Sequence, residues 1–397
     1  MRSKSDINRI IIFEPQCWGF EHATFNAAFL DMVLFAYPEA QIIFLGEKEH
    51  LNRVHGILEH YDAQALRRVE WQITLISDRT LIGWLRFLSE WRQFESILQY
   101  AKLHQSQLLF FTSISSSGIL ALKFRLYLHP LSFPLMAVIH GMLNRIVGRW
   151  PHKPWNWLLN LRVVLRLPQP RSLRYLVLGD SIHQALTEVQ PTLVTHFRPI
   201  GLPNFEYDDL FEGQNEDIKK GKILFGYLGT GNITKGIGSF ARIAKEFQRV
   251  NKQVEFLLVG SLSTWRDNTD YSCITGVTEQ PLSAEDYRKR ALSVTYVINT
   301  SNPEDYRLAP SSTFLDALFY GKPGIYLRNS YVEYYFGLMG DIGYLCDSYE
   351  GIVDIVQSII TEFPSIRYHH QVENIRKGRV ILTPRSLGPQ LREIVEN

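Results

Sequence analysis

The sequence predicts an α/β protein made of two Rossmann-like halves, and three observations support this prediction. Short apolar runs alternate with amphipathic segments, which is the pattern of strands and helices in a doubly wound sheet. The pattern restarts near residue 222, after a polar and acidic stretch that carries glycines, as a hinge between domains does. The 397 residues also exceed the roughly 250–300 at which one hydrophobic core stops growing.

In the first half, predicted strands alternate with helices. Arg9–Phe13 is predicted as a strand, followed by a loop with a glycine and by a helix near Thr24–Ala36. Apolar runs of this length, rich in β-branched residues, fit a parallel sheet that is covered on both faces. The further strands expected in this half are Gln41–Leu45, Gln72–Ile76, Gln107–Phe111, Leu135–Ile139 and Tyr175–Leu178.

The second half repeats the alternation. Lys222–Leu228 is predicted as a strand, and Gly229–Gly238 as the loop that opens the next helix. Further strands are expected at Val254–Val259, Val294–Ile298 and Gly324–Leu327. The last segment, Arg367–Asn397, predicts one or two helices, which Pro384 and Gly388 are expected to interrupt.

These patterns predict the domain boundaries. We expect an N-terminal Rossmann-like domain over 1–204, a linker over 205–221 and a second Rossmann-like domain over 222–375. The remaining residues, 376–397, are expected to form a helix that packs back on the N-terminal domain.

Composition indicates a globular protein of the cytoplasm. Hydrophobic residues make up 45% and charged residues 21% of the chain, and the apolar run Leu108–Leu122 is too short to span a bilayer. The three cysteines are far apart and odd in number, which predicts neither a disulfide framework nor a metal site. The polar start Met1–Asn8 predicts no signal peptide.

The most informative stretch is Ala309–Pro323. Ser311, Ser312 and Thr313 can cap a helix, and the free N–H groups of such a helix start suit a diphosphate. Asp316 follows one turn later, where a carboxylate can accept hydrogen bonds from ribose hydroxyls. A capped helix between two strands, with no ligand, would give the same pattern.

A second stretch, Tyr227–Gly238, is a glycine-rich turn after a strand. Gly229, Thr230 and Gly231 would let the backbone approach a phosphate, and Lys235 could neutralise its charge. A strand-to-helix turn with a solvated lysine is the alternative. Ser261, at the end of the next strand, is a weaker candidate for contact with a nucleotide base.

Together these features resemble the donor site of GT-B glycosyltransferases of the family 4, or group 1, type. Their motif has the form [DE]-A-x-x-x-G-x-P, and Asp316, Ala317, Gly321 and Pro323 match it. The resemblance implies two Rossmann-like domains facing each other across a cleft, with the donor in the second domain and the acceptor in the first. By the same resemblance Asp316 binds the donor ribose, while the diphosphate meets Gly229, Thr230, Gly231, Lys235, Ser311, Ser312 and Thr313.

One position departs from this pattern. Retaining members often carry a second glutamate eight residues before the first acid, and Leu308 stands there. The motif therefore predicts nucleotide-sugar binding and leaves the retaining and inverting outcomes both open.

The N-terminal half offers candidates for a catalytic base. Glu21 and His22 lie in the loop after the first strand, and His140 follows the strand Leu135–Ile139. In open α/β sheets such loops face the ligand, and an attacking sugar hydroxyl must lose its proton. His22 could equally cap or pack against its own helix. In the resembled family a histidine often faces the sugar at the position of His140.

A third stretch, Arg145–Arg166, combines tryptophans with cations and has no acid. Between Glu95 and Asp180 there are ten basic residues and no acidic one, which predicts a cationic surface. Tryptophans among cations are typical of segments that bind an anionic membrane surface. Nucleic acid would use the same side chains, but no nucleic-acid-binding signature accompanies them, so no nucleic-acid partner is expected. A surface helix with buried tryptophan faces is the alternative.

The sequence thus predicts a glycosyltransferase acting at the inner face of the membrane. Its partners would be a nucleotide-diphosphate sugar as co-substrate and a polysaccharide, lipopolysaccharide or lipid-linked saccharide as acceptor. No metal or other cofactor is expected, because Lys235 and a helix N-terminus can supply positive charge to the diphosphate. A nucleotide-sugar epimerase of the same fold and a non-catalytic binding protein of the same fold are the alternatives.

Overall fold

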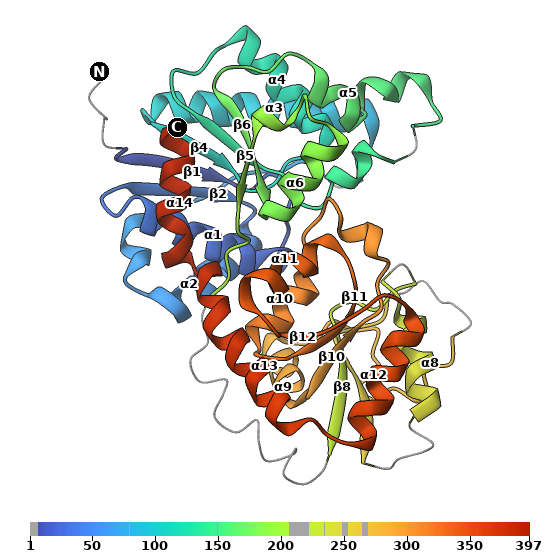
Figure 1. Cartoon of the computed structure of the whole chain (residues 1–397). Helices are drawn as coiled ribbons and strands as arrows, with labels where there is room; N and C mark the ends of the chain where they lie inside the picture. Colours follow the sequence, from blue (N-terminus) through green and yellow to red (C-terminus); the bar gives the residue numbers. More distant parts are fainter. Residues whose placement is uncertain are drawn as a thin grey trace. The chain divides into compact units, whose positions relative to one another are not determined.

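The chain forms two compact α/β units in a computed structural model, which describes residues 7–78, 80–148, 150–205, 222–233, 235–247, 253–263 and 269–397 (Figure 1). Unit 1 contains the described residues up to Phe205, with Leu308–Pro310 and Ile381–Asn397. Unit 2 contains the described residues from Lys222 to Arg307, with Ser311–Val380. The expected linker, 205–221, lies outside the described residues except for its first residue.

Unit 1 is built on a parallel sheet of seven strands, in the order β3-β2-β1-β4-β5-β6-β7. The order runs in one direction from β1 to β3 and in the other from β4 to β7, which is the doubly wound arrangement. All residues of β4 and β5 are buried, as a sheet covered on both faces requires. The strands are β1 (Arg9–Phe13), β2 (Gln41–Gly46), β3 (Val69–Ile73), β4 (Leu108–Phe111), β5 (Leu135–Val138), β6 (Leu173–Leu178) and β7 (Phe197–Ile200).

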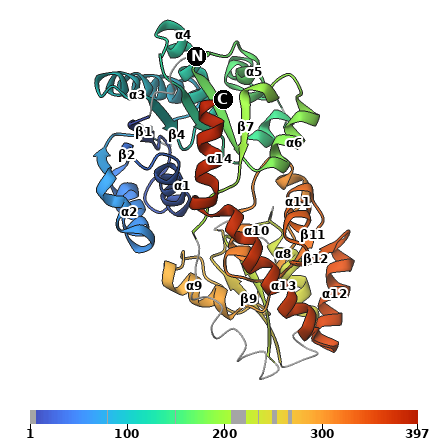
Figure 2. The same ribbon diagram turned by 60° about the vertical axis from the view of Figure 1, so that its left-hand side comes forward.

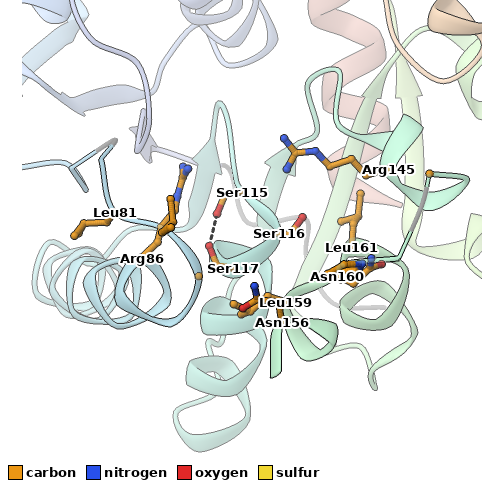
Figure 3. A pocket seen from close by; sticks show the side chains of 14 residues that line it. Leu81, Arg86, Ser115, Ser116, Ser117, Arg145, Asn156, Leu159, Asn160 and Leu161 are labelled. Carbon is orange, nitrogen blue, oxygen red and sulfur yellow. Dashed lines mark hydrogen bonds between the residues drawn. The ribbon is translucent and has the colours of Figure 1, made fainter. Parts of the chain in front are cut away.

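The helices of unit 1 cover both faces of this sheet. They are α1 (Ala23–Ala36), α2 (Lys48–Asp62), α3 (Gly83–Leu103), α4 (Ser116–Leu128), α5 (Leu161–Arg166), α6 (Asp180–Val189) and α14 (Pro384–Glu396), with the 3₁₀ turns η2 (Leu143–Ile146) and η3 (Pro154–Leu159). The starts of α3 and α4 and the segment from η2 to α5 surround a cavity (Figure 3).

Two edge strands of unit 1 differ from the prediction. The strand expected at Gln72–Ile76 is β3, which begins three residues earlier at Val69 and is largely exposed. The short strand β7 was not predicted, and it contains Pro199. Both strands pair on one side only, with β2 and β6 respectively, so burial imposes little apolar pattern on them. A proline is also tolerated there, because an edge strand has a side without ladder bonds.

As predicted, the last segment forms two helices with a break at Pro384, but Gly388 does not interrupt the second of them. Pro384 is the first residue of α14, after Thr383, whose side chain accepts a hydrogen bond from the Ser386 N–H at 3.3 Å. Proline suits this position because its missing N–H would have no partner in the helix. Gly388 lies inside α14, where a Cβ would come within 2.9 Å of the Phe35 Cβ. Its lack of a side chain therefore allows α14 to pack closely against α1 (Figure 2).

Unit 2 is built on a parallel sheet of five described strands, in the order β12-β11-β10-β8-β9. The chain leaves β8 for β9 on one side and returns to β10 on the other, so the order reverses between β8 and β10. The strands are β8 (Ile223–Leu228), β9 (Val254–Val259), β10 (Tyr296–Asn299), β11 (Gly324–Leu327) and β12 (Gly343–Cys346). Their helices are α8 (Ile237–Phe247), α9 (Ala284–Ser293), α10 (Ser312–Phe319), α11 (Ser330–Met339), α12 (Tyr349–Thr361) and α13 (Ser365–Gly378).

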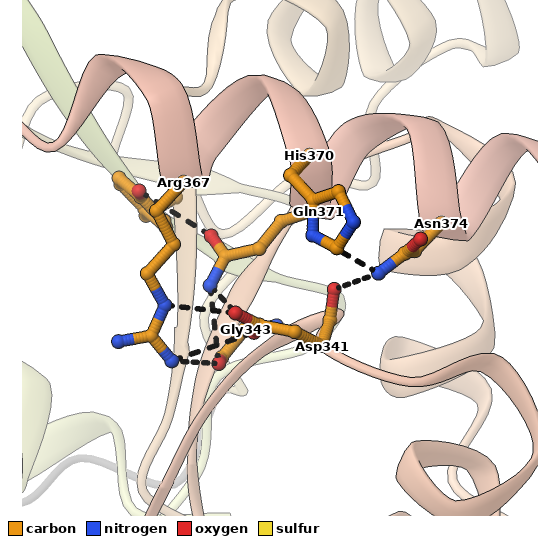
Figure 4. Close-up of polar contacts among 7 residues, drawn as sticks. Asp341, Gly343, Arg367, His370, Gln371 and Asn374 are labelled. Carbon is orange, nitrogen blue, oxygen red and sulfur yellow. Dashed lines mark hydrogen bonds and ion pairs between the residues drawn. The ribbon is translucent and has the colours of Figure 1, made fainter.

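Strand β12 was not predicted, and a polar network ties the residues before it to α13. Asp341 accepts hydrogen bonds from Arg367 Nε at 2.8 Å and from Gln371 Nε2 at 2.8 Å, and its carbonyl accepts one from Asn374 Nδ2 at 2.9 Å (Figure 4). These bonds outweigh the cost of burial and lower the pKa of Asp341. Helix α13 is therefore held on unit 2, whereas α14 packs within unit 1.

Among the described residues, no helix combines the length and the apolar character needed to cross a bilayer.

Candidate functional site

The candidate donor site lies in unit 2, where the strand order reverses. Ligands of open α/β sheets bind beyond the carboxyl ends of the strands at such a switch point. Gly229, Thr230 and Gly231 follow β8, while Thr300 and Ser301 follow its neighbour β10. The sheet therefore brings two of its loops together at this edge.

The glycine turn after β8 contacts the start of α10. Gly229 has a φ of +84°, a conformation that favours glycine, and its N–H donates to the Val259 carbonyl at 2.8 Å. A Cβ at Gly229 would lie 2.8 Å from Cγ2 of Thr313. The structure thus brings together the two stretches that the sequence singled out, although 84 residues separate Gly229 from Thr313 (313 − 229).

The start of α10 is capped by its own hydroxyls. Ser311 Oγ accepts from the Phe314 N–H at 3.3 Å and lies 3.3 Å from Thr313 Oγ1, which also accepts from Asn299 Nδ2 at 3.3 Å. The N–H groups of the exposed Ser312 and of Thr313 precede the first bond inside the helix. They are therefore able to donate to an anion.

The backbone of Lys235 is fixed by three hydrogen bonds. Its N–H donates to Asn232 Oδ1 at 2.8 Å, and its carbonyl accepts from Tyr227 Oη at 2.8 Å and from Ser301 Oγ at 3.0 Å. The next residue, Gly236, has a φ of +77°, and a Cβ there would lie 2.3 Å from the Thr300 carbonyl oxygen. The loops after β8 and β10 therefore hold Lys235 at a defined place.

Asp316 is the acidic group of this site. Tyr287 Oη donates to its Oδ2 at 2.8 Å. Burial raises the pKa of Asp316 to about 6, while the Tyr287 hydrogen bond and the positive charge of Lys235 act in the opposite direction.

The remaining donor-site candidates contribute backbone atoms. Ser261 accepts a hydrogen bond from the Gly231 N–H at 2.9 Å through its carbonyl, so its residue supports the glycine turn. Thr230, which links Gly229 to Gly231, is exposed.

Helix α10 ends in a Schellman motif, in which the Lys322 N–H donates to the Ala317 carbonyl and the Gly321 N–H to the Leu318 carbonyl. Gly321, at a φ of +64°, serves this helix end rather than a ligand.

Of the three candidate bases in unit 1, the structure places His22 and His140 side by side, while Glu21 bonds within its own loop. The imidazole rings of His22 and His140 lie 4.9 Å apart, and His140 also contacts the Phe25 ring at 4.3 Å. Burial, and then the neighbouring His22, lower the pKa of His140 to about 3, so its ring is neutral at neutral pH. His22 is exposed at the start of α1 and makes no capping hydrogen bond. Glu21 instead accepts from the Trp18 N–H at 3.4 Å, within its own loop.

A buried carboxylate near these histidines, that of Glu14, was not among the site residues predicted from the sequence. Glu14, directly after β1, accepts hydrogen bonds from the Gln16 N–H at 2.8 Å, from Asn26 Nδ2 at 3.0 Å and from Thr112 Oγ1 at 2.8 Å, and another from Ser113 Oγ. These bonds outweigh the desolvation of Glu14 and lower its pKa. The available signal was its position, because a polar residue that directly ends a buried strand lies at the carboxyl edge of the sheet.

The segment Arg145–Arg166 is not a single surface helix. It forms η2, η3 and α5, and Trp150, Trp155 and Trp157 have exposed fractions of 46%, 61% and 49%. These values contradict the alternative with buried tryptophan faces.

The structure also shows that the basic stretch is not wholly on the surface. Lys123 is buried and donates to the Leu165 and Leu167 carbonyls, while the buried Arg125 pairs with Glu95. Arg149 lies outside the described residues.

Within the described part of the chain, no three His, Cys, Asp or Glu side chains form a group that could hold a metal ion.

The fold is that of the GT-B class, as comparison with solved structures shows. Anabaena HepE in complex with UDP-glucose is 13% identical, with a TM-score of 0.63 over 98% of this chain and 99% of HepE. WaaG, a glycosyltransferase involved in lipopolysaccharide biosynthesis, is 11% identical, with a TM-score of 0.61 over 98% of this chain and 99% of WaaG.

An epimerase structure is similar as well. The putative UDP-N-acetylglucosamine 2-epimerase of Listeria monocytogenes is 10% identical, with a TM-score of 0.56 over 96% of this chain and 94% of the epimerase. No family model and no curated protein sequence matches this chain. At these identities the likeness concerns the fold, and function must be argued from the residues.

Proposed function

We propose that the protein is a glycosyltransferase that moves a sugar from a nucleoside-diphosphate sugar to a saccharide acceptor. The observation that carries this proposal is the contact between the Gly229 turn and Thr313 at the switch point of unit 2. This contact joins a backbone turn to a helix start, and the proposed site adds the cation of Lys235 and the carboxylate of Asp316 to them. The similar protein HepE has been solved in complex with UDP and in complex with UDP-glucose, so UDP is the first nucleotide to test.

Each group of the site has a role in this proposal. The N–H groups of Ser312 and Thr313, together with Lys235, stabilise the charge that develops on the leaving nucleoside diphosphate. Asp316 accepts hydrogen bonds from the ribose hydroxyls in its ionised form. Thr230 and Ser261 line the approach of the diphosphate and of the base.

The proposed base is His22, with His140 as its neutral neighbour. A pKa of about 3 makes His140 a poor proton acceptor at neutral pH, so we assign it a hydrogen bond to a sugar hydroxyl. His22 is exposed and beside it, which leaves His22 free to meet the acceptor. Leu308 has no carboxylate to offer at the position where retaining relatives often carry a glutamate, which favours neither stereochemical outcome by itself.

Thermal unfolding with nucleoside diphosphates and their sugars tests donor binding. A ligand that binds only the folded state at 100 times its Kd stabilises that state by about 2.7 kcal/mol, which raises Tm. We expect UDP or another nucleoside diphosphate to raise Tm for the wild type, and Asp316→Ala and Lys235→Met to weaken the effect. Glu285→Ala and Lys289→Met, exposed on α9, are matched controls that should respond like the wild type. A panel without any binder would refute the proposal.

The reaction itself separates transfer from the alternatives. An epimerase would interconvert UDP-N-acetylglucosamine and its 2-epimer without an acceptor. A non-catalytic binding protein would bind the nucleotide and leave the sugar attached. Transfer of the labelled sugar to an added saccharide acceptor, lost in His22→Ala, is the result that we expect.

We also propose that unit 1 docks on an anionic membrane surface through the exposed tryptophans of η3 and its neighbours. The Lys153 ammonium lies 5.8 Å from the Trp155 ring centroid, and the Arg162 guanidinium 5.2 Å from that of Trp150. Trp84 Nε1 donates to the Trp155 carbonyl at 3.0 Å and so joins the start of α3 to this surface. Ring and cation together suit the level of lipid headgroups.

Sedimentation with vesicles tests this docking. The protein should pellet with vesicles that contain phosphatidylglycerol and much less with vesicles of phosphatidylcholine alone. Trp155→Ala with Trp157→Ala should reduce the bound fraction, while Trp18→Ala, in the exposed loop before α1, should not. Equal sedimentation with both kinds of vesicle would contradict electrostatic docking.

A further inference from the structure

A cavity of about 500 Å³ lies within unit 1, between the start of α3, the start of α4 and the segment from η2 to α5. Figure 3 shows Arg86 on one side and Arg145 on the other, with Ser115 and Ser116 between them. Asn160 also lines the cavity. Among the described residues that line the cavity there is no aspartate or glutamate, so their polar groups are cations, hydroxyls and amides.

One wall of the cavity is held rigidly by a buried carboxylate beneath it. Glu90 is 1% exposed and accepts from Ser115 Oγ at 2.6 Å, from Ser117 Oγ at 2.5 Å and from Arg86 Nε at 3.1 Å. Arg86 also donates through Nη2 to Gln16 Oε1 at 3.4 Å. Its guanidinium is thus fixed by two partners, and its charge is offset by Glu90.

Arg145 supplies the charge that Glu90 does not offset. Its guanidinium has no ion pair or hydrogen bond among the described residues, and it lines the cavity. The turn that carries it is fixed by Arg162, which donates to the Ile146 carbonyl at 2.6 Å and to the Gly148 carbonyl at 3.4 Å. The net charge of the described lining residues is therefore positive, and Arg145 supplies it.

Ser116 is the observation that points to a ligand. It is 8% exposed and lines the cavity, and within the described part of the chain its hydroxyl has no hydrogen-bond partner. Its Oγ is not one of the sealed, unpaired polar atoms of the described interior, so it is open to the cavity and can donate a hydrogen bond to a polar ligand there. Asn160 adds a donor, because its Oδ1 accepts from the Arg162 N–H at 2.9 Å and its amide NH₂ remains available.

We propose that this cavity binds the phosphate group of a phosphorylated saccharide, which is the acceptor of the reaction. The inference rests on the proposed function and deepens it. Arg145 and Arg86 would pair with the phosphate oxygens, Ser116 would donate to one of them, and Asn160 would meet a sugar hydroxyl. A volume of about 500 Å³ lies within the range of small-molecule sites and admits a sugar ring with its phosphate.

The opening of the cavity supports an acceptor that comes from the membrane surface. Its lining includes Ile82, Pro151 and Leu159, which neighbour the exposed Trp84, Trp150 and Trp157 along the chain. A phosphate of a lipid headgroup would present the same chemistry to Arg145. The test must therefore distinguish a phosphosugar from a headgroup.

The experiment is titration calorimetry of the full chain with glucose 1-phosphate, in saturating UDP so that the donor site is filled. We expect the wild type to bind glucose 1-phosphate and not glucose, and Arg145→Gln and Ser116→Ala to weaken binding about tenfold or more. The control is Arg92→Gln. Arg92 is an exposed arginine of α3, the helix that also carries Arg86, but it does not line the cavity, so this variant should bind glucose 1-phosphate like the wild type. Circular dichroism and UDP binding, unchanged in all three variants, would show that they fold.

Vesicles provide the second arm. If the cavity takes a phosphosugar, Arg145→Gln should bind phosphatidylglycerol vesicles as the wild type does. Loss of vesicle binding in Arg145→Gln without any glucose 1-phosphate binding by the wild type would overturn the inference in favour of a headgroup. Absence of glucose 1-phosphate binding while UDP still binds would overturn it and leave the glycosyltransferase proposal intact. Failure of UDP to bind would count against the proposed donor site instead.

Discussion

The substitution Gly229→Ala tests whether the turn after β8 and the start of α10 form one site. It adds a Cβ at a residue with a φ of +84°, 2.8 Å from Cγ2 of Thr313. The positive φ costs a residue with a Cβ about 1–2 kcal/mol, and the close contact adds about 1 kcal/mol or more. The expected loss of stability is therefore about 2–3 kcal/mol, or a Tm lower by about 4–12 °C for a unit of this size.

The cause of this loss can be divided experimentally. Thr313→Ser removes Cγ2 and relieves the close contact but leaves the backbone strain. In a double-mutant cycle, Gly229→Ala and Thr313→Ser should therefore show a favourable coupling of about 1 kcal/mol. Differential scanning calorimetry measures the stability of each variant. Titration with UDP should show weaker binding to Gly229→Ala than to the double variant.

Gly337→Ala is the matched control. Gly337 lies in α11, where a Cβ would meet no heavy atom within 4 Å, and alanine in a helix interior should stabilise by about 0.5–1 kcal/mol. If Gly229→Ala were no more harmful than Gly337→Ala, or if Thr313→Ser gave no coupling, the turn and the helix would not be in contact. The shared donor site would then have to be withdrawn.

Three further predictions concern ionisable groups. Asp316, with a pKa raised to about 6, binds more protons in the folded state between its ordinary value near 3.8 and 6, so stability should fall as the pH rises through this window. Asp316→Asn should flatten that slope in denaturant unfolding. Because the ionised carboxylate is the proposed acceptor for the ribose hydroxyls, the affinity of the wild type for UDP-glucose, whose phosphates do not titrate near pH 6, should rise over the same pH window, and Asp316→Asn should abolish this rise. His140, with a pKa lowered to about 3, favours the unfolded state as the pH falls below about 6.5, and His140→Gln should reduce the resulting loss of stability between pH 7 and 5. Asp341→Ala removes the carboxylate that accepts from Arg367 and Gln371, so it should lower the free energy of unfolding by about 2 kcal/mol at pH 7. In the wild type this contribution should disappear as the pH falls through the lowered pKa of Asp341. An unchanged urea midpoint for Asp341→Ala would contradict this prediction.

Strands buried on both faces were predictable from the sequence. Almost every residue is buried in β1, β4, β5 and β8. In the sequence each of these strands is a run of apolar residues with almost no polar interruption, which indicates burial on both faces. The edge strand β3 has no such apolar run, and its start was predicted three residues late.

The residues of the proposed donor site were predictable one by one as parts of turns and helix ends, because each has a local reason. Ser311 caps a helix, Gly229 adopts a positive φ and Gly321 ends a helix, and each of these needs only its neighbours along the chain. The order of elements also led us to expect that the Gly229 turn and the start of α10 share one pocket. The structure brings Gly229 and Thr313 together, and donor binding there stays a prediction.

The roles of Glu14 and Glu90 depend on partners that are remote along the chain. Glu14 accepts from Thr112, 98 residues later, and Glu90 from Ser115, 25 residues later. A carboxylate that is buried and satisfied looks like any exposed one in a sequence, because only its surroundings differ.

The amino-acid sequence by itself determined the alternation of strands and helices, the two halves and the local turns, since these follow from nearest neighbours and from the period of apolar residues. The tertiary structure alone decided which polar groups became partners and which, like Ser116 and Arg145, were left facing a cavity. The physical reason is that hydrogen bonding and burial depend on distances in space, and the folded sheet sets those distances between residues that are remote along the chain.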